Sequence, residues 1–245
     1  MSTQTNLPTP KSALAIGAHP DDIEFGCGAT LAKWAAFDAR IHLLICTDGS
    51  KGTWDPTADT NELISRRQTE QRQAAIQLGA TGEVIFLGAQ DGELNHNRAK
   101  RSQVSRIIRE LRPEVVLGHD PWQRWRLHPD HRAAGWLTID SVVAARDPHY
   151  HREHGLNHHR PTALLLFECE EPNHLETLNK THLDAKVSAL LTHQSQFETT
   201  MAIDENDDGS QTVRFRQRIL QESYKVGQRV GTAHAEAFRF IDPAS

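Results

Sequence analysis

The chain of 245 residues carries 27 basic and 32 acidic side chains, a formal net charge of −5, which argues against a nucleic-acid partner held through its phosphates. Its three cysteines are widely spaced and give no disulfide framework, the polar start from Met1 to Lys11 lacks the apolar core of a secretory signal, and no apolar run approaches a membrane span. We therefore expect a cytoplasmic protein without a membrane partner, folded as one domain over residues 1–245.

The predicted elements alternate between strand and helix. The short apolar run Ala13 to Ile16 is typical of a buried strand of a parallel sheet. The last third is less regular, since Asp204 to Ser210 is a polar loop and Val213 to Val226 is compatible with helix or strand. Repeated strand–helix units predict an α/β fold, a Rossmann-like, doubly wound, mostly parallel sheet with helices on both faces. The patterns place strands at residues 13–16, 41–47, 84–87, 115–117 and 163–167, and helices at 26–37, 62–78, 98–111, 131–145 and 178–191.

The motif His19-Pro20-Asp21-Asp22 directly follows the first predicted strand. Open α/β sheets bind their ligands just beyond the carboxyl ends of the strands. His19 and Asp22 have side-chain types that bind a divalent metal, which leaves Asp21 as a candidate base. The alternative is an ordinary turn, because His-Pro and Asp-Asp pairs are common in turns.

A second motif, His128-Pro129-Asp130-His131, follows the fourth predicted strand by about ten residues and so falls at the same edge of the sheet. A carboxylate beside a histidine commonly fixes its tautomer or raises its basicity. Together the motifs supply His19, Asp22 and one of the later histidines. Three protein ligands with a position left for water are what a catalytic zinc site requires.

These motifs, within GAHPDDIEFGCGATLAKW and HPDHRAAG, closely resemble the LmbE/PIG-L family of metal-dependent N-acetylglucosaminyl deacetylases. Softer matches at Arg67 to Gly79, Leu87 to Gly92, Lys186 to Gln196 and Ala235 to Phe240 extend the resemblance over most of the chain. The resemblance implies a hydrolase that removes acetyl from the 2-acetamido group of a small N-acetylglucosamine-type conjugate. A close alternative is an amidase for a larger acyl group on a mycothiol-type glucosaminyl conjugate. An alternative of another class is a metal- or sugar-binding protein without turnover.

The resemblance also implies roles for individual residues. Spacing alone does not separate Asp21 from Asp22, so that assignment depends on the family. The cofactor implied is Zn²⁺, with Fe²⁺ as the alternative in the cell. By this resemblance His19, Asp22 and His131 would bind the metal, Asp21 would be the general base for the metal-bound water, His128 would stabilise the oxyanion and protonate the amine, and Asp130 would orient His128.

Four further residues are candidates for substrate contact. Arg67 resembles an arginine that binds the sugar, although an exposed helical residue is the alternative. Ser50 stands where the family has a glutamate, which puts one sugar contact in doubt. Arg126 stands where some members have a tyrosine, and its cation would differ chemically beside an oxyanion. His193 either lines the pocket or faces the negative end of a helix dipole.

Five histidines crowd His149 to His159. Three interpretations stay open for this region: solvated loop histidines, a second metal site, and a pocket entrance or subunit contact. Glu24 is expected to compensate the dipole at a helix start. Gly26 and Gly28 lack the third glycine of a dinucleotide loop, so nucleotide binding is discounted. Because family members are often oligomeric, a homo-oligomer is expected.

Overall fold

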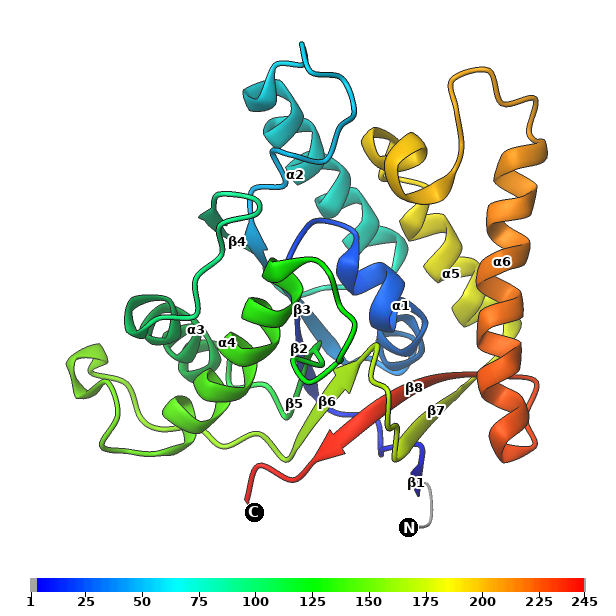
Figure 1. Ribbon diagram of the computed structural model, residues 1–245. Coiled ribbons are helices and arrows are strands. Elements are labelled where there is room, and N and C mark those ends of the chain that lie inside the picture. The colour runs from blue at the N-terminus through cyan, green and yellow to red at the C-terminus, as the bar shows by residue number, and fades with distance from the viewer. Residues whose placement is uncertain (1–3, 245) are drawn as a thin grey trace.

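The computed structural model describes residues 4–244, and the predicted polar start therefore lies partly outside the described residues. An eight-stranded sheet runs through it between helical layers (Figure 1). The α/β prediction is confirmed. The strands are β1 (Gln4–Thr5), β2 (Ser12–Gly17), β3 (Arg40–Thr47), β4 (Val84–Ala89), β5 (Val115–His119), β6 (Ala163–Phe167), β7 (His174–Leu178) and β8 (His234–Ile241). The longer helices are α1 (Asp22–Ala35), α2 (Thr60–Gln77), α3 (Arg98–Leu111), α4 (Pro129–Arg146), α5 (Lys180–Leu190) and α6 (Ser210–Gly227), and short helical turns are η1 (Arg152–His154), η2 (Gln194–Gln196), η3 (Phe197–Met201) and η4 (Gln228–Val230).

The order of the strands creates a switch point in the middle of the sheet. The order is β1-β7-β8-β6-β5-β2-β3-β4, and every pairing is parallel except those that β8 makes with β6 and β7. The chain runs from β2 outward through β3 and β4, and then returns to β5 and β6 on the other side of β2. Ligands of such sheets bind where the order reverses, here beyond the carboxyl ends of β2 and β5.

Alternate residues of β2 show why helices cover both faces. Ala13 and Ala15 belong to the core under α1, α2 and α5, whereas Leu14 and Ile16 belong to the core under α3 and α4. All four are fully buried. A strand buried on both faces has a continuous apolar sequence rather than an alternating one, which is why the first strand was readable from its residues.

The antiparallel part of the sheet, β7 and β8, has a weaker signal because it buries charged pairs. In β7, Glu176 accepts from Lys33 Nζ at 2.8 Å and contacts His174 Nε2 at 2.8 Å. In β8, Glu236 forms an ion pair with Lys186 Nζ at 2.7 Å. These acids break the apolar run, although each has its partner. The segment left open between helix and strand is α6, which packs against β8.

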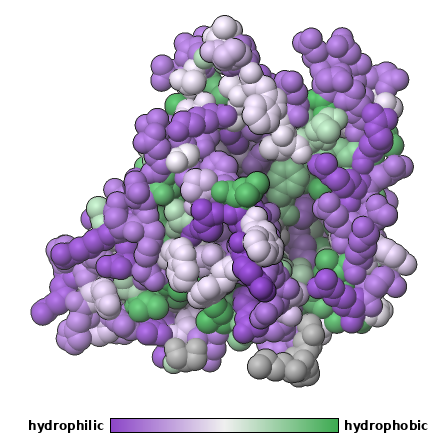
Figure 2. All heavy atoms as spheres, in the orientation of Figure 1, coloured by the Kyte–Doolittle hydropathy of each residue, from purple (hydrophilic) through white to green (hydrophobic). Residues whose placement is uncertain are grey.

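The elements around the two motifs extend further than their apolar patterns predict. Helix α1 begins at Asp22 rather than Gly26, so the first motif leads directly into a helix N-terminus. Strand β5 continues through His119, and α4 begins at Pro129 within the second motif. None of the helices in residues 4–244 is long and apolar enough to cross a membrane. Figure 2 shows a mostly hydrophilic face on which hydrophobic residues emerge in small groups.

Candidate metal centre

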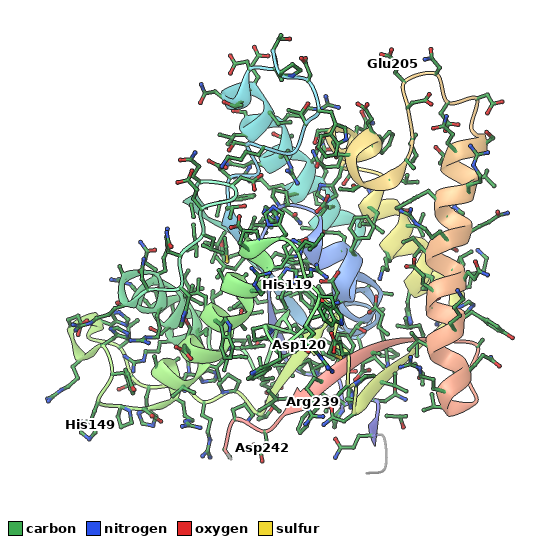
Figure 3. The ribbon with its side chains drawn as sticks, viewed as in Figure 1. His119, Asp120, His149, Glu205, Arg239 and Asp242 are labelled. Atoms are coloured by element: carbon green, nitrogen blue, oxygen red, sulfur yellow. The ribbon has the colours of Figure 1, made fainter. Side chains whose placement is uncertain are left out.

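The carboxyl ends of the parallel strands bring histidines and carboxylates from distant parts of the chain to one edge of the sheet, which we call the carboxyl edge. His119, the last residue of β5, lies near the middle of the molecule (Figure 3). His19 follows β2, Asp91 follows β4 and Glu168 follows β6. His19 contacts Asp91, and His119 contacts both Glu168 and Asp22. The start of α4 adds His131. The sheet therefore assembles this cluster.

Three donors from the predicted metal ligands converge. His19 Nδ1 lies 3.2 Å from His131 Nε2 and 3.3 Å from Asp22 Oδ2, and His131 Nε2 lies 3.3 Å from Asp22 Oδ1. Tetrahedral ligands at about 2.0–2.1 Å from zinc are about 3.3–3.4 Å apart. Two imidazole nitrogens and a carboxylate at this separation fit a divalent metal, and His19, His128 and His131 also lie within ligand reach of one another.

The outer nitrogen of His19 faces two carboxylates. His19 Nε2 lies 3.1 Å from Asp91 Oδ1 and 3.2 Å from Asp130 Oδ2. The Asp130 carboxylate also accepts the backbone N–H groups of Gly92 at 2.7 Å and Leu94 at 3.1 Å. A carboxylate on the second nitrogen of a ligand histidine fixes its ring and tautomer. Burial opposes its ionisation, yet the contact with His19 and these N–H groups hold the pKa of Asp130 below its usual value.

His128 caps helix α4 and is nearly half exposed at the mouth of the cluster. Its Nδ1 accepts the backbone N–H of Asp130 at 3.3 Å, so the proton of the neutral ring belongs on Nε2. The Asp130 carboxylate, expected to orient His128, instead contacts His19. Only the backbone of Asp130 positions His128, and the carboxylate facing Nε2 is Asp91 at 4.0 Å.

His119 sits between two carboxylates. Its Nε2 lies 3.2 Å from Asp22 Oδ2 and its Nδ1 lies 3.1 Å from Glu168 Oε2. Burial alone would lower the pKa of His119, but the charges and hydrogen bonds of Asp22 and Glu168 raise it. His119 and His19 therefore contact the same oxygen of Asp22.

Asp21 has an unusual backbone and an unpaired oxygen. Its φ of 95° lies in a region that L residues rarely adopt, and its N–H donates to Gln71 Oε1 at 3.0 Å. Within the described residues, the buried Oδ2 of Asp21 has no hydrogen-bond partner, and Arg67 Nη2 is 3.9 Å away. Burial raises the pKa of Asp21 to about 7, against the opposing charge of Arg67 and with the charge of Asp22 adding to it.

The neighbouring carboxylate behaves in the opposite way. Burial works against its ionisation, but the charges of His131 and His119 hold the pKa of Asp22 well below its usual value. Two adjacent carboxyl groups whose pKa values are pushed apart are typical of an acid–base site. The structure thus distinguishes Asp21 from Asp22, which their spacing in the sequence could not do.

A buried network supports Asp21 from behind. Arg67 is 3 % exposed, which excludes the exposed-helix reading, and it donates to Gly49 O at 2.9 Å and Pro20 O at 2.7 Å. Glu24 lies in the first turn of α1, as expected, but it is fully buried and accepts from Gln71 Nε2 at 2.6 Å. His193 is also fully buried, with Nε2 3.6 Å from Glu24 Oε2. It therefore faces Glu24 in the protein interior.

A cavity of about 570 Å³ opens onto the cluster. Its lining includes residues of both motifs together with Arg67 and Arg126, whereas neither Ser50 nor His193 is among the lining residues. Ser50 is buried, and its N–H donates to Asp48 Oδ1 at 3.0 Å. A cavity of about 540 Å³ that includes Asp120, Arg239 and Asp242 lies elsewhere, along the end of β8 (Figure 3). Of the four tentative substrate contacts, Arg67 and Arg126 reach the first cavity.

Arg126 is engaged with the metal-site residues. Its Nη2 pairs with Glu168 Oε2 at 2.6 Å, and its guanidinium contacts His131 Nδ1. Burial lowers the pKa of His131 to about 4, Asp22 opposes this, and the charges of His119 and Arg126 add to it. His131 is therefore neutral at neutral pH, the form that binds a metal.

The histidines from His149 to His159 lie away from the site. Their loop joins α4 to β6 and contacts residues that precede β5, as when His159 Nε2 donates to Pro113 O at 2.7 Å. Figure 3 shows His149 at the periphery, far from His119. Within the described chain, this loop is at the amino ends of the strands and does not line the cavity at the cluster.

Comparison with known proteins agrees with the geometry. The model of the PIG-L family, described as GlcNAc-PI de-N-acetylase, matches residues 14–142. Diacetylchitobiose deacetylase of Thermococcus kodakarensis is 36% identical over 190 residues, which cover 76% of this chain and 70% of the relative. The chain belongs to the PIG-L family.

Other PIG-L relatives and structures extend the match. A 1D-myo-inositol 2-acetamido-2-deoxy-alpha-D-glucopyranoside deacetylase of Streptomyces avermitilis is 29% identical over 58% of this chain, and the match spans only 56% of that relative's length. The structure of N,N'-diacetylchitobiose deacetylase from Pyrococcus horikoshii superimposes with a TM-score of 0.85 and 28% identity, covering 96% of this chain and 85% of that one. The PIG-L fold therefore extends over nearly the whole chain.

Sequence reasoning missed three residues of this PIG-L site: Asp91, His119 and Glu168. Each ends or closely follows a predicted strand, as His19 does. The carboxyl-edge rule would have found all three if it had been applied to every strand rather than only to those followed by a motif.

Proposed function

We propose that this protein is a zinc-dependent hydrolase that removes acetyl from the 2-acetamido group of an N-acetylglucosamine-type conjugate and releases acetate and an amine. The observation that carries the proposal is the convergence of His19, Asp22 and His131 donors, 3.2–3.3 Å apart, in the cavity that also exposes Asp21. PIG-L membership supports the class, a metal-dependent amide hydrolase. The named substrates of the relatives, diacetylchitobiose and a glucosaminyl inositol, support the amino-sugar substrate.

A divalent metal would be held by His19, Asp22 and His131, and it would supply Lewis-acid chemistry that polarises a carbonyl group and lowers the pKa of water. The carboxylate of Asp21, which lines the cavity and whose pKa burial raises to about 7, accepts the proton of the attacking water. Arg67 holds the backbone at Pro20 and so keeps Asp21 turned into the cavity.

His128 acts on the opposite side of the reacting carbonyl. Because its Nδ1 is occupied by the Asp130 N–H, its Nε2–H is the group offered to the negative charge that develops on the acetamide oxygen. Its partial exposure leaves room for the amine, which takes the Nε2 proton of His128 as the C–N bond breaks, and the proton that Asp21 accepted from water restores the neutral ring. Asp91 and Asp130 act indirectly, by holding His19 in its orientation.

The test is acetate release from N-acetylated chitobiose, glucosaminyl inositol and glucosaminyl malate, with products identified by mass spectrometry, for the wild type and Asp21→Asn. We expect Asp21→Asn to retain its metal and to lose activity by about 10³-fold or more. Full activity in metal-loaded Asp21→Asn would refute the assignment of the base. Loading the metal-free protein with Zn²⁺ or, without oxygen, with Fe²⁺ tests the choice of metal. Tight sugar binding without any product would favour the binding protein, and turnover of only larger acyl conjugates would favour the amidase.

A further inference from the structure

A separate cavity of about 880 Å³ lies at the amino ends of the strands, away from the metal centre. Four segments meet there: the end of α3, the end of α4, the loop before β6 and the chain after β8. Figure 1 shows the chain end after β8 and the loop between α4 and β6 on the same side of the sheet. We call it the arginine cavity, because its lining includes Arg112, Arg146, Asp147, His158, His159 and Arg160. We propose that the arginine cavity binds a phosphate group, either as the free ion or as part of a small molecule.

Positive charge dominates the lining of the arginine cavity. Three arginines stand against a single carboxylate, that of Asp147, although the chain as a whole has a net charge of −5. Burial lowers the pKa of His159, and the charges of Arg112 and His158 lower it further. A guanidinium group stays charged at any working pH, and its planar fork binds two oxygens of a phosphate at once. A positive cavity on an acidic chain therefore favours an anionic ligand.

Two of the three arginines keep their charge unpaired. Arg146 is the exception, because its Nε donates to Asp147 Oδ1 at 2.9 Å and its Nη1 donates to Pro243 O at 2.5 Å. Arg112 Nη1 makes one long contact, with His158 O at 3.4 Å. Among residues 4–244, neither Arg112 nor Arg160 has a carboxylate within ion-pair distance. The donors of these two side chains are therefore available to the oxygens of a phosphate.

The backbone on both sides of the arginine cavity is held in place. Arg112 ends α3 in the left-handed region, with φ 51° and ψ 50°, a conformation that few residues other than glycine adopt. On the facing loop, the His159 N–H donates to Ala145 O at 2.9 Å, and His159 Nε2 donates to Pro113 O at 2.7 Å. Arg160 follows this anchored residue directly. A ligand therefore has only the arginine side chains to order, which keeps the entropic cost of binding low.

The size of the arginine cavity and its one acid favour a small ligand over a polymer. Its volume lies within the range of small-molecule sites, about 300–1,000 Å³. A nucleic acid would need basic residues that continue beyond the cavity, and the net charge of the chain argues against such a partner. The Asp147 carboxylate repels an extended polyanion but can accept hydroxyl groups next to a single phosphate.

Helix α4 separates the arginine cavity from the metal centre. His131 lies in the first turn of α4 and Arg146 is its last residue, so about 22 Å of helix lies between them. A phosphate in the arginine cavity therefore does not touch the metal ligands. The inference does not depend on the proposed hydrolase activity, because binding alone tests it.

The test is calorimetric titration of the wild type with inorganic phosphate and with glycerol 3-phosphate, at an ionic strength fixed with sodium chloride. We expect one ion per chain with a Kd of about 1 mM or below. Arg112→Gln and Arg160→Gln should each raise this Kd by about tenfold, because each removes charge-assisted hydrogen bonds. Arg106→Gln is the control, since Arg106 lies on α3 but pairs with Glu110 at 2.8 Å. It should leave the Kd unchanged.

His131→Ala distinguishes the arginine cavity from the metal centre, because a bound metal also attracts phosphate. Its Kd for phosphate should equal that of the wild type. Loss of binding in His131→Ala but not in Arg160→Gln would place the phosphate at the metal and overturn the inference. Absence of saturable binding by the wild type, or an equal Kd in the wild type, Arg112→Gln and Arg160→Gln, would also overturn it. Tighter binding of glycerol 3-phosphate assigns the cavity to a phosphorylated small molecule, and tighter binding of inorganic phosphate assigns it to the free ion.

Discussion

Histidines cluster at both edges of the parallel sheet, but the charged residues beside them differ in sign. At the carboxyl edge, His19 and His119 face the carboxylates of Asp91, Asp22 and Glu168. At the amino edge, the loop containing His151 wraps around Arg109, whose guanidinium donates to its backbone. There the stacked rings of His151 and His154, 5.2 Å apart, have Glu153 as their acidic neighbour, and it is well exposed. The same residue type therefore builds a site at one edge and a scaffold at the other.

The sign of the neighbouring charge explains the difference. Burial works against the charged form of His19 and His119, yet the hydrogen bonds and charges of nearby carboxylates raise the pKa of both. At the amino edge burial lowers the pKa of His154 and His159, and nearby arginines lower it further. Carboxylates that attract a proton also attract a metal ion, whereas unpaired arginines repel both. Arg126, which contacts His131 at the carboxyl edge, is itself paired with Glu168. The count of histidines in a segment is thus a poor guide to a metal site.

The largest effect is expected when one histidine is removed from each edge and the two variants are compared. His131→Ala should lose its bound metal and lower acetate release by about 10³-fold or more, because the variant lacks one of the three proposed metal ligands. His151→Ala should keep one metal ion per chain, because His151, Glu153 and His154 are not expected to hold one despite lying within ligand reach. Metal content by mass spectrometry and acetate release measure both. Retention of metal by His131→Ala, with loss in His151→Ala, would reverse the assignment of the edges.

The candidate site was predictable where it depended on local motifs and not where it depended on pairing. His19, Asp22 and His131 could be named because their spacing follows strands and resembles a family. The contact of Asp130 with His19 could not be predicted from the sequence. The N–H groups of Gly92 and Leu94, far away in the sequence, set the rotamer that turns the Asp130 carboxylate to His19. Long-range hydrogen bonds of this kind leave no pattern in either segment alone.

At the amino edge, the next expected effect is on stability rather than on activity. Arg109 is 3 % exposed and donates to the carbonyls of Ala144, Ala145, Asp147, Tyr150 and His151, so it caps the end of α4 and the loop after it. Arg109→Met should lower the free energy of unfolding by about 3 kcal/mol, because buried carbonyls lose their donors. Urea unfolding measures this, and activity per folded molecule should persist.

The control for Arg109 is on the same helix. Arg106 pairs with Glu110 at 2.8 Å on the surface, and Arg106→Met should change the free energy of unfolding by less than about 0.5 kcal/mol. Equal losses in both variants would show that the carbonyl cap contributes nothing special. Loss of activity per folded molecule in Arg109→Met would show that the amino edge is coupled to the site.

No strand was predicted at β7 or β8, for a similar reason. Most of the parallel strands contain a continuous apolar run, which predicts a buried strand, and Ala163–Phe167 matches its prediction at both ends. In β7 and β8 the buried acids Glu176 and Glu236 interrupt the pattern, and their partners Lys33 and Lys186 come from α1 and α5. The charge of each acid is compensated only by its lysine partner. Because that lysine is distant in the sequence, the strand segment alone shows an unpaired charge and does not indicate burial.

At the carboxyl edge, a smaller effect on metal affinity is expected from a change at Asp130. Asp130→Asn keeps the shape of the side chain but removes the charge that faces His19, so metal affinity should fall by about 10- to 100-fold. Asp140 offers a matched control on the same helix, since it also pairs with a histidine, His96, at 2.8 Å without facing the cluster. Competition with a chelator measures both affinities. If Asp140→Asn weakens metal binding as much as Asp130→Asn does, the contact with His19 is not the cause.

The smallest expected effect concerns the pH dependence of stability at the amino edge. Burial lowers the pKa of His159, the carbonyl of Pro113 opposes this, and the charges of Arg112 and His158 lower it further. Because the folded pKa is below the unfolded value of about 6.5, the neutral ring stabilises the fold above that pH, and this contribution is lost as the pH falls through the folded pKa. His159→Gln still has a donor for Pro113 O but no charge to gain. Urea unfolding at pH 7, 6 and 5 should therefore show a shallower loss of stability for His159→Gln than for the wild type, and a steeper loss would mean that protonated His159 stabilises the fold.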